Sequence, residues 1–432
     1  VYLDARQARR VLHGDRVLVR VAGVDHRQRP FGAVTEVLSR ANSEVVGRYF
    51  RDGGVGYVVP DNRAINQDLL IPAGEEASAR HGQIVVAGIT QQPDMHCQPI
   101  ARVSDVVTES DRAGRVDLRD LPFVTIDGAD ARDFDDAVYC RKTPDGYRLL
   151  VAIADVAHYV PEGSALDAGA LERGTSVYFP DRVIPMLPES LSNGICSLKP
   201  EVERLALVCE LGLDADGAPR KSRFYNAVIR SHARLIYEDV AAWFDQPRTR
   251  GKSIRNQVLE LHALYLKLRE RREQRGALDI DQQEPRFIYN AARKIERIES
   301  RERNDAHRLI EECMILANVA AAEYLQKHRL AALYRVHARP DGDRLEALRT
   351  FLAELGLSLP GGDAPSARDY ATVLGWARGR PDQHLIETVL LRSMKLAAYR
   401  AENAGHFGLA LEAYTHFTSP IRRYPDLVVH RA

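Results

Sequence analysis

Residues 125–155 read TIDGADARDFDDAVYCRKTPDGYRLLVAIAD, and this stretch contains the two features that organise the rest of the chain. Its first part holds five aspartates within ten residues, offset by one arginine, so the local charge is −4. Its second part holds two apolar, β-rich runs, 137–141 and 147–155, separated by the turn sequence Thr-Pro-Asp-Gly at 143–146. The stretch therefore predicts a β-hairpin that follows directly after an acidic loop.

Short β-rich segments precede the acidic loop, with turn residues between them, at 17–21, 31–38, 44–50, 56–59, 69–71 and 83–89. This spacing predicts a small barrel of the OB or cold-shock kind. Tyr49, Phe50 and Tyr57 lie here beside Arg48 and Arg51. Proteins of this kind stack bases on aromatic rings within a basic groove, so the three rings are candidate substrate contacts. The alternative is that they divide between barrel core and hairpin surface.

Beyond the first hairpin, a second one is expected from 205–213 and 223–229. Apolar residues then recur three or four positions apart, which predicts helices over 240–273, 305–328, 344–355 and 385–403. The expected fold class is α+β, with an N-terminal OB/cold-shock β-barrel followed by a large mixed α/β catalytic domain.

The composition of the 432 residues is that of an ordinary folded protein, with 45% hydrophobic and 28% charged residues. Lys and Arg number 60, as do Asp and Glu, which excludes a basic nucleic-acid-binding tail as the source of function. The five cysteines form no C-x-x-C pair, so a reducing, cytoplasmic location is expected. No apolar run approaches the 18 residues of a membrane span, and no membrane association is expected.

Crowded carboxylates next to apolar strands need cations among them, because mutual repulsion and burial both disfavour their charged form. Two divalent ions would neutralise four aspartates and could activate water for attack on a phosphodiester. An all-oxygen ligand set favours Mg²⁺ or Mn²⁺ over zinc. A calcium-binding EF-hand loop is excluded, because counting from Asp133 its required sixth-position glycine is Val138. A solvated acidic turn remains the alternative.

The acidic motif resembles the catalytic motif of the ribonuclease II superfamily, the RNB-domain proteins. Further blocks carry the same resemblance, at 151–160 (VAIADVAHYV), 174–180 (GTSVYFP), 184–188 (IPMLP), 191–198 (LSNGICSL) and 417–426 (FTSPIRRYPD). Together these blocks cover nearly all of the chain from residue 118 onward. The resemblance implies a processive, hydrolytic 3′→5′ exoribonuclease that releases nucleoside 5′-monophosphates with two metal ions.

The resemblance also assigns roles to individual residues. It implies that the metal ligands and catalytic carboxylates are Asp127, Asp133, Asp135 and Asp136, whereas Asp130 is not among them. Arg422 falls on the arginine that contacts the scissile phosphate, and the other substrate contacts implied are Tyr178, Arg423, Glu311 and Ile280. A core position for Tyr178, and surface charge for Arg423 and Glu311, are the competing interpretations. Ile280 stands where relatives carry an aromatic ring.

The resemblance implies a domain order as well. Residues 1–30 are expected to be the remnant of a first cold-shock domain, 31–106 a second, and 107–432 the RNB catalytic domain, with no S1 domain in this chain. The expected cofactor is Mg²⁺, with Mn²⁺ as a substitute. The expected partner is single-stranded RNA, or RNA with a 3′ single-stranded overhang, bound by a monomer.

Two other function classes stay open from the sequence. One is a non-catalytic RNA-binding protein that keeps only the fold, and the other is a metal-dependent phosphatase or endonuclease. The zero net charge excludes neither a nuclease nor RNA binding, because it sums opposite regions: residues 1–30 hold seven Arg against three Asp, whereas 127–136 carry −4.

Overall fold

The computed structural model describes residues 2–24, 29–62, 64–107, 114–180, 182–246, 253–280, 284–290, 294–301 and 303–432. The chain forms two compact units. The first comprises Val1–Ala113, Val156–Val177 and Ile184–Ser197, and the second comprises Gly114–Asp155, Tyr178–Val183 and Leu198–Ala432. Among the described residues, no helix combines the length and the apolar character that crossing a membrane requires.

The first unit is rich in strands. A three-stranded sheet has the order β1-β3-β2, with β1 (Tyr2–Leu3), β2 (Arg16–Val24) and β3 (Pro30–Ser39) beside the short helix α1 (Ala5–Ala8). A closed barrel of order β4-β5-β6-β8-β7 follows, made of β4 (Glu44–Asp52), β5 (Val55–Pro60), β6 (Leu69–Ile71), β7 (Ile84–Gln91) and β8 (Ile100–Val107). All six strands predicted in this region are confirmed. The unit also contains α2 (Val156–Tyr159), α3 (Ala165–Arg173) and the π-helical turn η1 (Leu191–Ile195).

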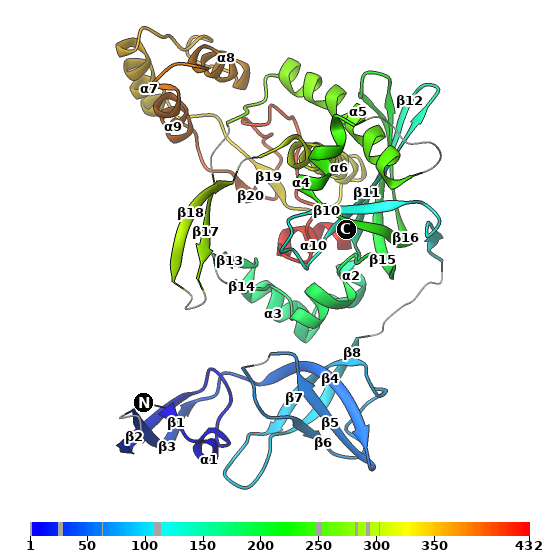
Figure 1. Ribbon diagram of the computed structural model, residues 1–432, viewed down its shortest axis with the longest axis vertical. Helices are drawn as coiled ribbons and strands as arrows, with labels where there is room; N and C mark the ends of the chain where they lie inside the picture. Colours follow the sequence, from blue (N-terminus) through cyan, green and yellow to red (C-terminus); the bar gives the residue numbers. More distant parts are fainter. Residues whose placement is uncertain are drawn as a thin grey trace. The chain divides into compact units, whose positions relative to one another are not determined.

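The second unit is built on a six-stranded sheet of order β10-β11-β12-β15-β16-β9 (Figure 1). Its strands are β9 (Val116–Asp117), β10 (Phe123–Asp127), β11 (Asp136–Thr143), β12 (Gly146–Ala154), β15 (Glu203–Asp214) and β16 (Pro219–Ile236). Strand β10 pairs with β11 and also, in parallel, with β16, so five of the strands close into a ring. The acidic loop is the connection from β10 to β11.

The predicted hairpin β11–β12 turns at Gly146, which has a φ of +144°. A Cβ atom there would lie 2.2 Å from the carbonyl oxygen of Leu213 on the neighbouring strand β15. Glycine is therefore required both by the backbone conformation and by the close approach of β15.

Helices and small ribbons complete the second unit. The helices are α4 (Tyr237–Phe244), α5 (Ile254–Arg275), α6 (Asp305–His328), α7 (Gly342–Glu354), α8 (Ala367–Ala377), α9 (Gln383–Ser393) and α10 (Tyr424–Arg431). The ribbons are β17 (Glu284–Tyr289) with β18 (Ile295–Arg301) and β19 (Tyr334–Val336) with β20 (Ala398–Arg400). A further ribbon, β13 (Val177–Phe179) with β14 (Arg182–Ile184), has residues 178–183 in this unit and its two outer residues in the first. Residues of α4, α5 and α6 share one apolar core with the sheet, whereas α7, α8 and α9 enclose a separate core (Figure 1).

Two predicted helices need correction. The helix expected over 240–273 is two helices, because α4 ends at Phe244 and α5 begins at Ile254 after its N-cap Ser253; residues 247–252 lie outside the described part. The helix expected over 385–403 ends at Ser393, because Met394 adopts an extended conformation and residues 398–400 instead pair with β19. Helix α6 has the predicted bounds, and Asn304 caps its first turn.

Candidate active site

The acidic loop starts and ends at one edge of the second unit's sheet. Asp127 is the last residue of β10 and Asp136 the first of β11, and these strands are neighbours, so the two aspartates are held at the same edge. Asp133 and Asp135 lie in the loop between them. Asp130 is exposed.

Asp135 is the most deeply buried of these aspartates, with 6% of its surface exposed. Its Oδ1 accepts a hydrogen bond of 2.9 Å from the backbone N–H of Ile421, and its Oδ2 lies 3.6 Å from Nε of Arg422. Burial raises the pKa of Asp135 well above its ordinary value, and the opposing effect of Arg422 does not cancel this. The carboxylate is thus fixed in place but short of positive charge.

Asp136 shows the same shortage of cations. Its removal from water, followed by repulsion from Asp127, raises the pKa of its carboxyl group to about 7. Arg422 lowers the pKa of Asp136, but by less than burial raises it. The Oδ1 of Asp127 accepts a hydrogen bond of 2.7 Å from the N–H of Gly128. A divalent cation would remove this imbalance.

The chemistry of the donor set fits a hard divalent cation, because all four side chains offer carboxylate oxygens, which Mg²⁺ and Mn²⁺ prefer. The four carboxylates are not arranged as a complete set of metal ligands in this structure. Within the described residues, no three His, Cys, Asp or Glu side chains are grouped so that they could hold a metal ion as they stand. The assignment of Asp127, Asp133, Asp135 and Asp136 as metal ligands therefore remains a prediction.

Tyr178 reaches the acidic cluster from the ribbon β13–β14. The residue is half-exposed, at 51%, and its hydroxyl donates a hydrogen bond of 3.1 Å to Oδ2 of Asp133. Burial and the negative charge of Asp133 raise the pKa of Tyr178, so the phenol stays neutral. The position offers an exposed aromatic face beside the carboxylates and does not match a core tyrosine.

Arg422 and Arg423 are engaged differently. The Nη2 of Arg422 bonds Oγ of Ser419 at 3.2 Å, and 47% of its side chain is exposed. Arg423 forms two bonds, of 2.9 and 2.7 Å, to the fully buried carboxylate of Asp426, which also accepts a bond from the N–H of Ser419. Arg423 thus has a structural partner, and Arg422 is the better placed of the two to contact an incoming anion.

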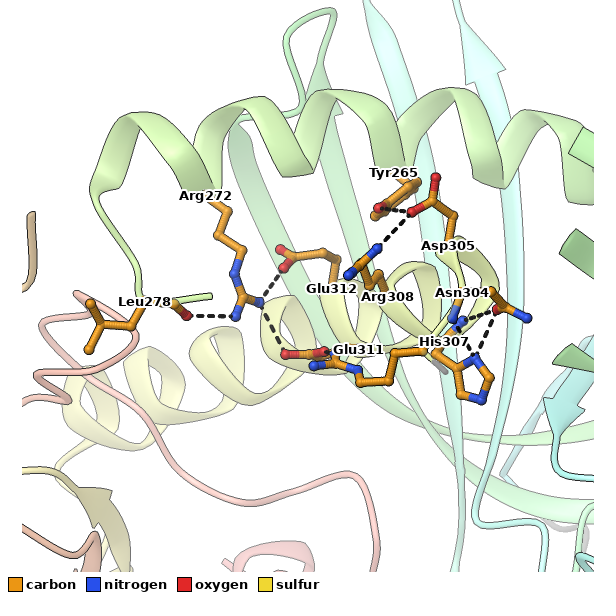
Figure 2. A network of polar contacts seen from close by, with 10 residues as sticks. Tyr265, Arg272, Leu278, Asn304, Asp305, His307, Arg308, Glu311 and Glu312 are labelled. Atoms are coloured by element: carbon orange, nitrogen blue, oxygen red, sulfur yellow. Dashed lines mark hydrogen bonds and ion pairs between the residues drawn. The ribbon is translucent and has the colours of Figure 1, made fainter. Parts of the chain in front are cut away.

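Glu311 lies on α6 in a separate polar network, shown in Figure 2. The Nη1 of Arg272 lies 3.1 Å from Oε1 of Glu311 and 2.7 Å from Oε1 of Glu312, while its Nη2 donates to the carbonyl oxygen of Leu278 at 3.3 Å. Arg303 forms a second ion pair with Glu311. These side chains line a cavity of about 310 Å³.

The remaining candidate contacts differ in whether they lie in a core or at the surface. Ile280 is partly buried and packs against the core of α7, α8 and α9. Phe50 and Tyr57 stack on each other at the barrel surface, with ring centres 5.7 Å apart. Tyr49 is only 2% exposed and belongs to the barrel core, because alternate residues of a strand face opposite sides. The prediction that Tyr49 contacts substrate is therefore wrong in this structure.

Sequence reasoning missed several groups in and around this site. The N–H of Ile421 is a backbone donor, so no side chain marks it. Arg272 and Arg303 were missed because they reach Glu311 from other elements, and an arginine on a helix surface has no distinguishing pattern.

Comparison with known proteins identifies the class to which this fold and site belong. The family model described as "RNB domain" matches residues 115–432, so the chain belongs to the RNB-domain family. The models described as "Cold shock domain" and "Ribonuclease B OB domain" match residues 57–115 and 1–37. The resemblance seen in the sequence and the predicted fold class are both confirmed.

Within that family, the curated proteins similar to this chain include ribonucleases R. Those of Escherichia coli and Vibrio parahaemolyticus are 47% and 49% identical to this chain over its full length, which spans 58% and 57% of theirs. Among solved structures, Mycoplasma genitalium RNase R in complex with ribose-methylated single-stranded RNA matches all of this chain and 74% of its own, with 28% identity and a TM-score of 0.71. The same protein has also been solved with double-stranded RNA.

Proposed function

We propose that this chain is a metal-dependent 3′→5′ exoribonuclease that hydrolyses RNA processively to nucleoside 5′-monophosphates. The observation that carries the proposal is the set of aspartates at one sheet edge, with raised pKa values for Asp135 and Asp136, next to the half-exposed Arg422 and Tyr178. The names of the curated relatives and of the solved RNase R complexes point to the same activity.

The aspartates would hold the metal ions, for which we propose Mg²⁺ with Mn²⁺ as a substitute. Bound at Asp127, Asp133, Asp135 and Asp136, such ions supply a water of lowered pKa and stabilise the leaving oxygen of a phosphodiester. The chain's own contribution is to keep one carboxylate immobile. Asp135 is held through its side chain by the N–H of Ile421, and its carbonyl oxygen accepts from the N–H of Ala154 at 2.8 Å.

Arg422 would bind the scissile phosphate. Its guanidinium now lies 3.6 Å from Asp135, a long ion pair that a phosphate oxygen can replace with shorter charge-assisted bonds. The planar guanidinium remains charged throughout and offers two parallel donors to a phosphate. Arg423 would assist mainly by holding the turn, since its own guanidinium is bound to Asp426.

The remaining residues would hold the RNA. Tyr178 presents an exposed ring on which a base can stack, and Glu311 and Ile280 would line the place of the last nucleotides. In the first unit, the stacked pair Phe50 and Tyr57 would receive bases of the incoming strand. The substrate we propose is single-stranded RNA, or RNA with a 3′ single-stranded overhang, acted on by a monomer in the cytoplasm.

The test uses 5′-labelled RNA with a 3′ overhang, with and without Mg²⁺, and identifies the products by mass. We expect nucleoside 5′-monophosphates, and only with the metal. Asp135→Asn should slow their release at least about 100-fold, since even the outer partners of metal ligands are worth about 10- to 100-fold. Asp130→Asn, an exposed neighbour, is the matched control and should leave the rate unchanged.

Three outcomes would contradict the proposal. Mononucleotide release by Asp135→Asn at the parent rate would mean that the carboxylate is not catalytic. A ladder of internal cuts, or phosphate without mononucleotides, would indicate an endonuclease or a phosphatase. RNA that is bound but never shortened by the unmutated chain would indicate an RNA-binding protein.

A further inference from the structure

One arginine outside the family motif contacts the backbone of the acidic loop. Arg234 lies on β16 and pairs in register with Thr125 of β10. Its Nη2 is within hydrogen-bonding distance of three loop carbonyl oxygens, those of Gly128 (3.3 Å), Ala129 and Ala131 (3.4 Å). A single nitrogen thus contacts three residues of the loop segment that separates Asp127 from Asp133.

The same guanidinium also contacts the second half of the loop. Its central carbon lies 5.4 Å from the centre of the Phe134 ring, which is 6% exposed. Phe134 stands between Asp133 and Asp135, and a cation over an aromatic face is favourable. Arg234 therefore touches the loop on both sides of Asp133, through backbone carbonyl oxygens on one side and the ring of Phe134 on the other.

We propose that Arg234 is a positioning residue, which holds the acidic loop in the shape that lets Asp127 and Asp133 turn toward a shared divalent cation. The inference rests on the proposed function, because it assumes that the aspartates bind metal. An arginine suits this role because its guanidinium stays charged and is planar, so that its edge can donate to loop carbonyl oxygens while its face lies over a ring.

The position of Arg234 separates this role from a contribution to overall stability. The residue is exposed, and interactions of exposed charges contribute little to the free energy of unfolding. Loop carbonyls freed by its removal can bond to water instead. Loss of the side chain should therefore leave the fold intact while allowing the loop to adopt shapes in which the carboxylates diverge.

The test is the affinity for Mn²⁺, measured by calorimetry on the whole chain without RNA. We expect Arg234→Met to weaken Mn²⁺ binding about 10- to 100-fold, as for other groups that orient metal ligands. Arg234→Lys should fall between this variant and the parent. The matched control is Arg223→Met, on the same strand, whose partner is Glu210 at 2.8 Å and not the loop; its affinity should stay within twofold of the parent.

A second readout follows the reaction. For Arg234→Met, the Mn²⁺ concentration giving half-maximal RNA hydrolysis should rise by the same factor, while kcat at saturating Mn²⁺ returns to the parent value. A merely structural role would lower the melting temperature and kcat together and would not be rescued by metal.

Each other outcome has a definite meaning. Equal Mn²⁺ affinity in the parent, Arg234→Met and Arg234→Lys would overturn the inference and leave the proposed function intact. Weaker binding of RNA in the absence of metal, at unchanged Mn²⁺ affinity, would mean that Arg234 is an RNA contact. A parent chain that binds no Mn²⁺ would contradict the metal centre itself, and with it the role of Arg234. If Arg234→Met does not fold, the Mn²⁺ affinity of Arg234→Lys, compared with that of the parent, tests the inference.

Discussion

Two acidic clusters in the second unit differ in how their charge is balanced. At the sheet edge, the guanidinium of Arg422 lies 3.6 Å from Asp135, and the burial of this carboxyl group outweighs the effect of Arg422 on its pKa. On α6, Glu311 and Glu312 share Arg272 (Figure 2). Arg303 adds a second positive charge beside Glu311. The α6 cluster is neutral from its own residues, whereas the sheet-edge cluster is not.

This difference distinguishes a cluster whose charge the protein balances itself from one that is suited to take up metal ions. Carboxylates that a protein buries for structural reasons come with their own cations, because unpaired buried charge is costly. Carboxylates buried without enough cations raise the free energy of the empty protein, and a bound cation releases that energy. Burial raises the pKa of Glu312 as well as that of Asp136, which it raises to about 7. The clusters differ in the opposing cation, because Arg272 lies 2.7 Å from Glu312, whereas Arg422 lies 3.6 Å from Asp135.

Removal of the cation Arg272 from the α6 cluster should have the largest effect on stability. Arg272 and Glu312 have side chains only 13% and 7% exposed, so Arg272→Met leaves a buried carboxylate without its partner. We expect the free energy of unfolding to fall by about 3–5 kcal/mol, measured with urea. The double variant Arg272→Met with Glu312→Met should regain most of this. A loss below about 1 kcal/mol would mean that the pair is not an internal balance.

The sheet-edge cluster should make the free energy of unfolding depend on pH when no metal is present. The pKa of Asp136 rises from 3.8 to about 7 on folding. The folded state therefore holds this proton more tightly than the unfolded state, so the stabilisation is full below pH 4 and is lost as the pH rises to 7. Three units correspond to about 4 kcal/mol, and we expect about 3, because neighbouring carboxylates share the effect.

This pH dependence is measured by urea unfolding with a chelator present, at pH values from 4 to 8. Asp136→Asn should flatten the profile, because its amide does not titrate. Glu311→Gln, in the balanced cluster, is the control. A profile that Asp136→Asn leaves unchanged would contradict the assignment of the raised pKa to this residue.

Divalent cations should stabilise the protein through the sheet-edge cluster alone. At a Mn²⁺ concentration about 100 times its Kd, the expected gain is about 2.7 kcal/mol. A thermal melt with and without Mn²⁺ measures it. The gain should be lost in Asp133→Asn and kept in Glu311→Gln. An equal loss in both variants would remove the distinction between the two clusters.

Tyr178 should give the smallest effects, because it is a neutral group attached to the unbalanced cluster. Tyr178→Ala removes the exposed ring and should weaken RNA binding by about 1–3 kcal/mol, the usual worth of one stacked base. Tyr178→Phe loses only the hydrogen bond to Asp133 and should change RNA affinity by less than about 1 kcal/mol. Fluorescence anisotropy with metal-free protein compares the two, and equal losses would show that the hydroxyl, not the ring, holds RNA.

The sequence predicted the parts of the fold that depend on local signals. The hairpin at Gly146 and the helix that begins after Asn304 have strong turn and cap residues, and both were placed correctly. The end of α9 could not be read, because residues 398–400 are turned into a strand by pairing with β19, more than sixty positions earlier. Tertiary contacts outweighed an uninterrupted helical pattern there.

The candidate site also has features that the sequence predicted and features that it did not. The acidic motif is contiguous, so its aspartates and their crowding were visible in the sequence. Tyr49 was misplaced because the face on which a strand residue lies depends on the barrel's register, and Tyr57 on the next strand points outward. The donor from Ile421 and the contacts of Arg234 come from backbone geometry, which no residue type announces.

The bond between Asp135 and the N–H of Ile421 joins positions 286 apart in the chain, and this has a consequence for synthesis. A ribosome adding about 5–20 residues per second needs roughly 15–60 seconds to pass from one to the other. Throughout that interval the nascent chain carries the aspartates without the donor that fixes the central one and without Arg422 beside it. A chain cut or stalled before residue 421 would thus hold every acidic residue of the motif and still lack an assembled site, so catalytic competence would be acquired late in translation.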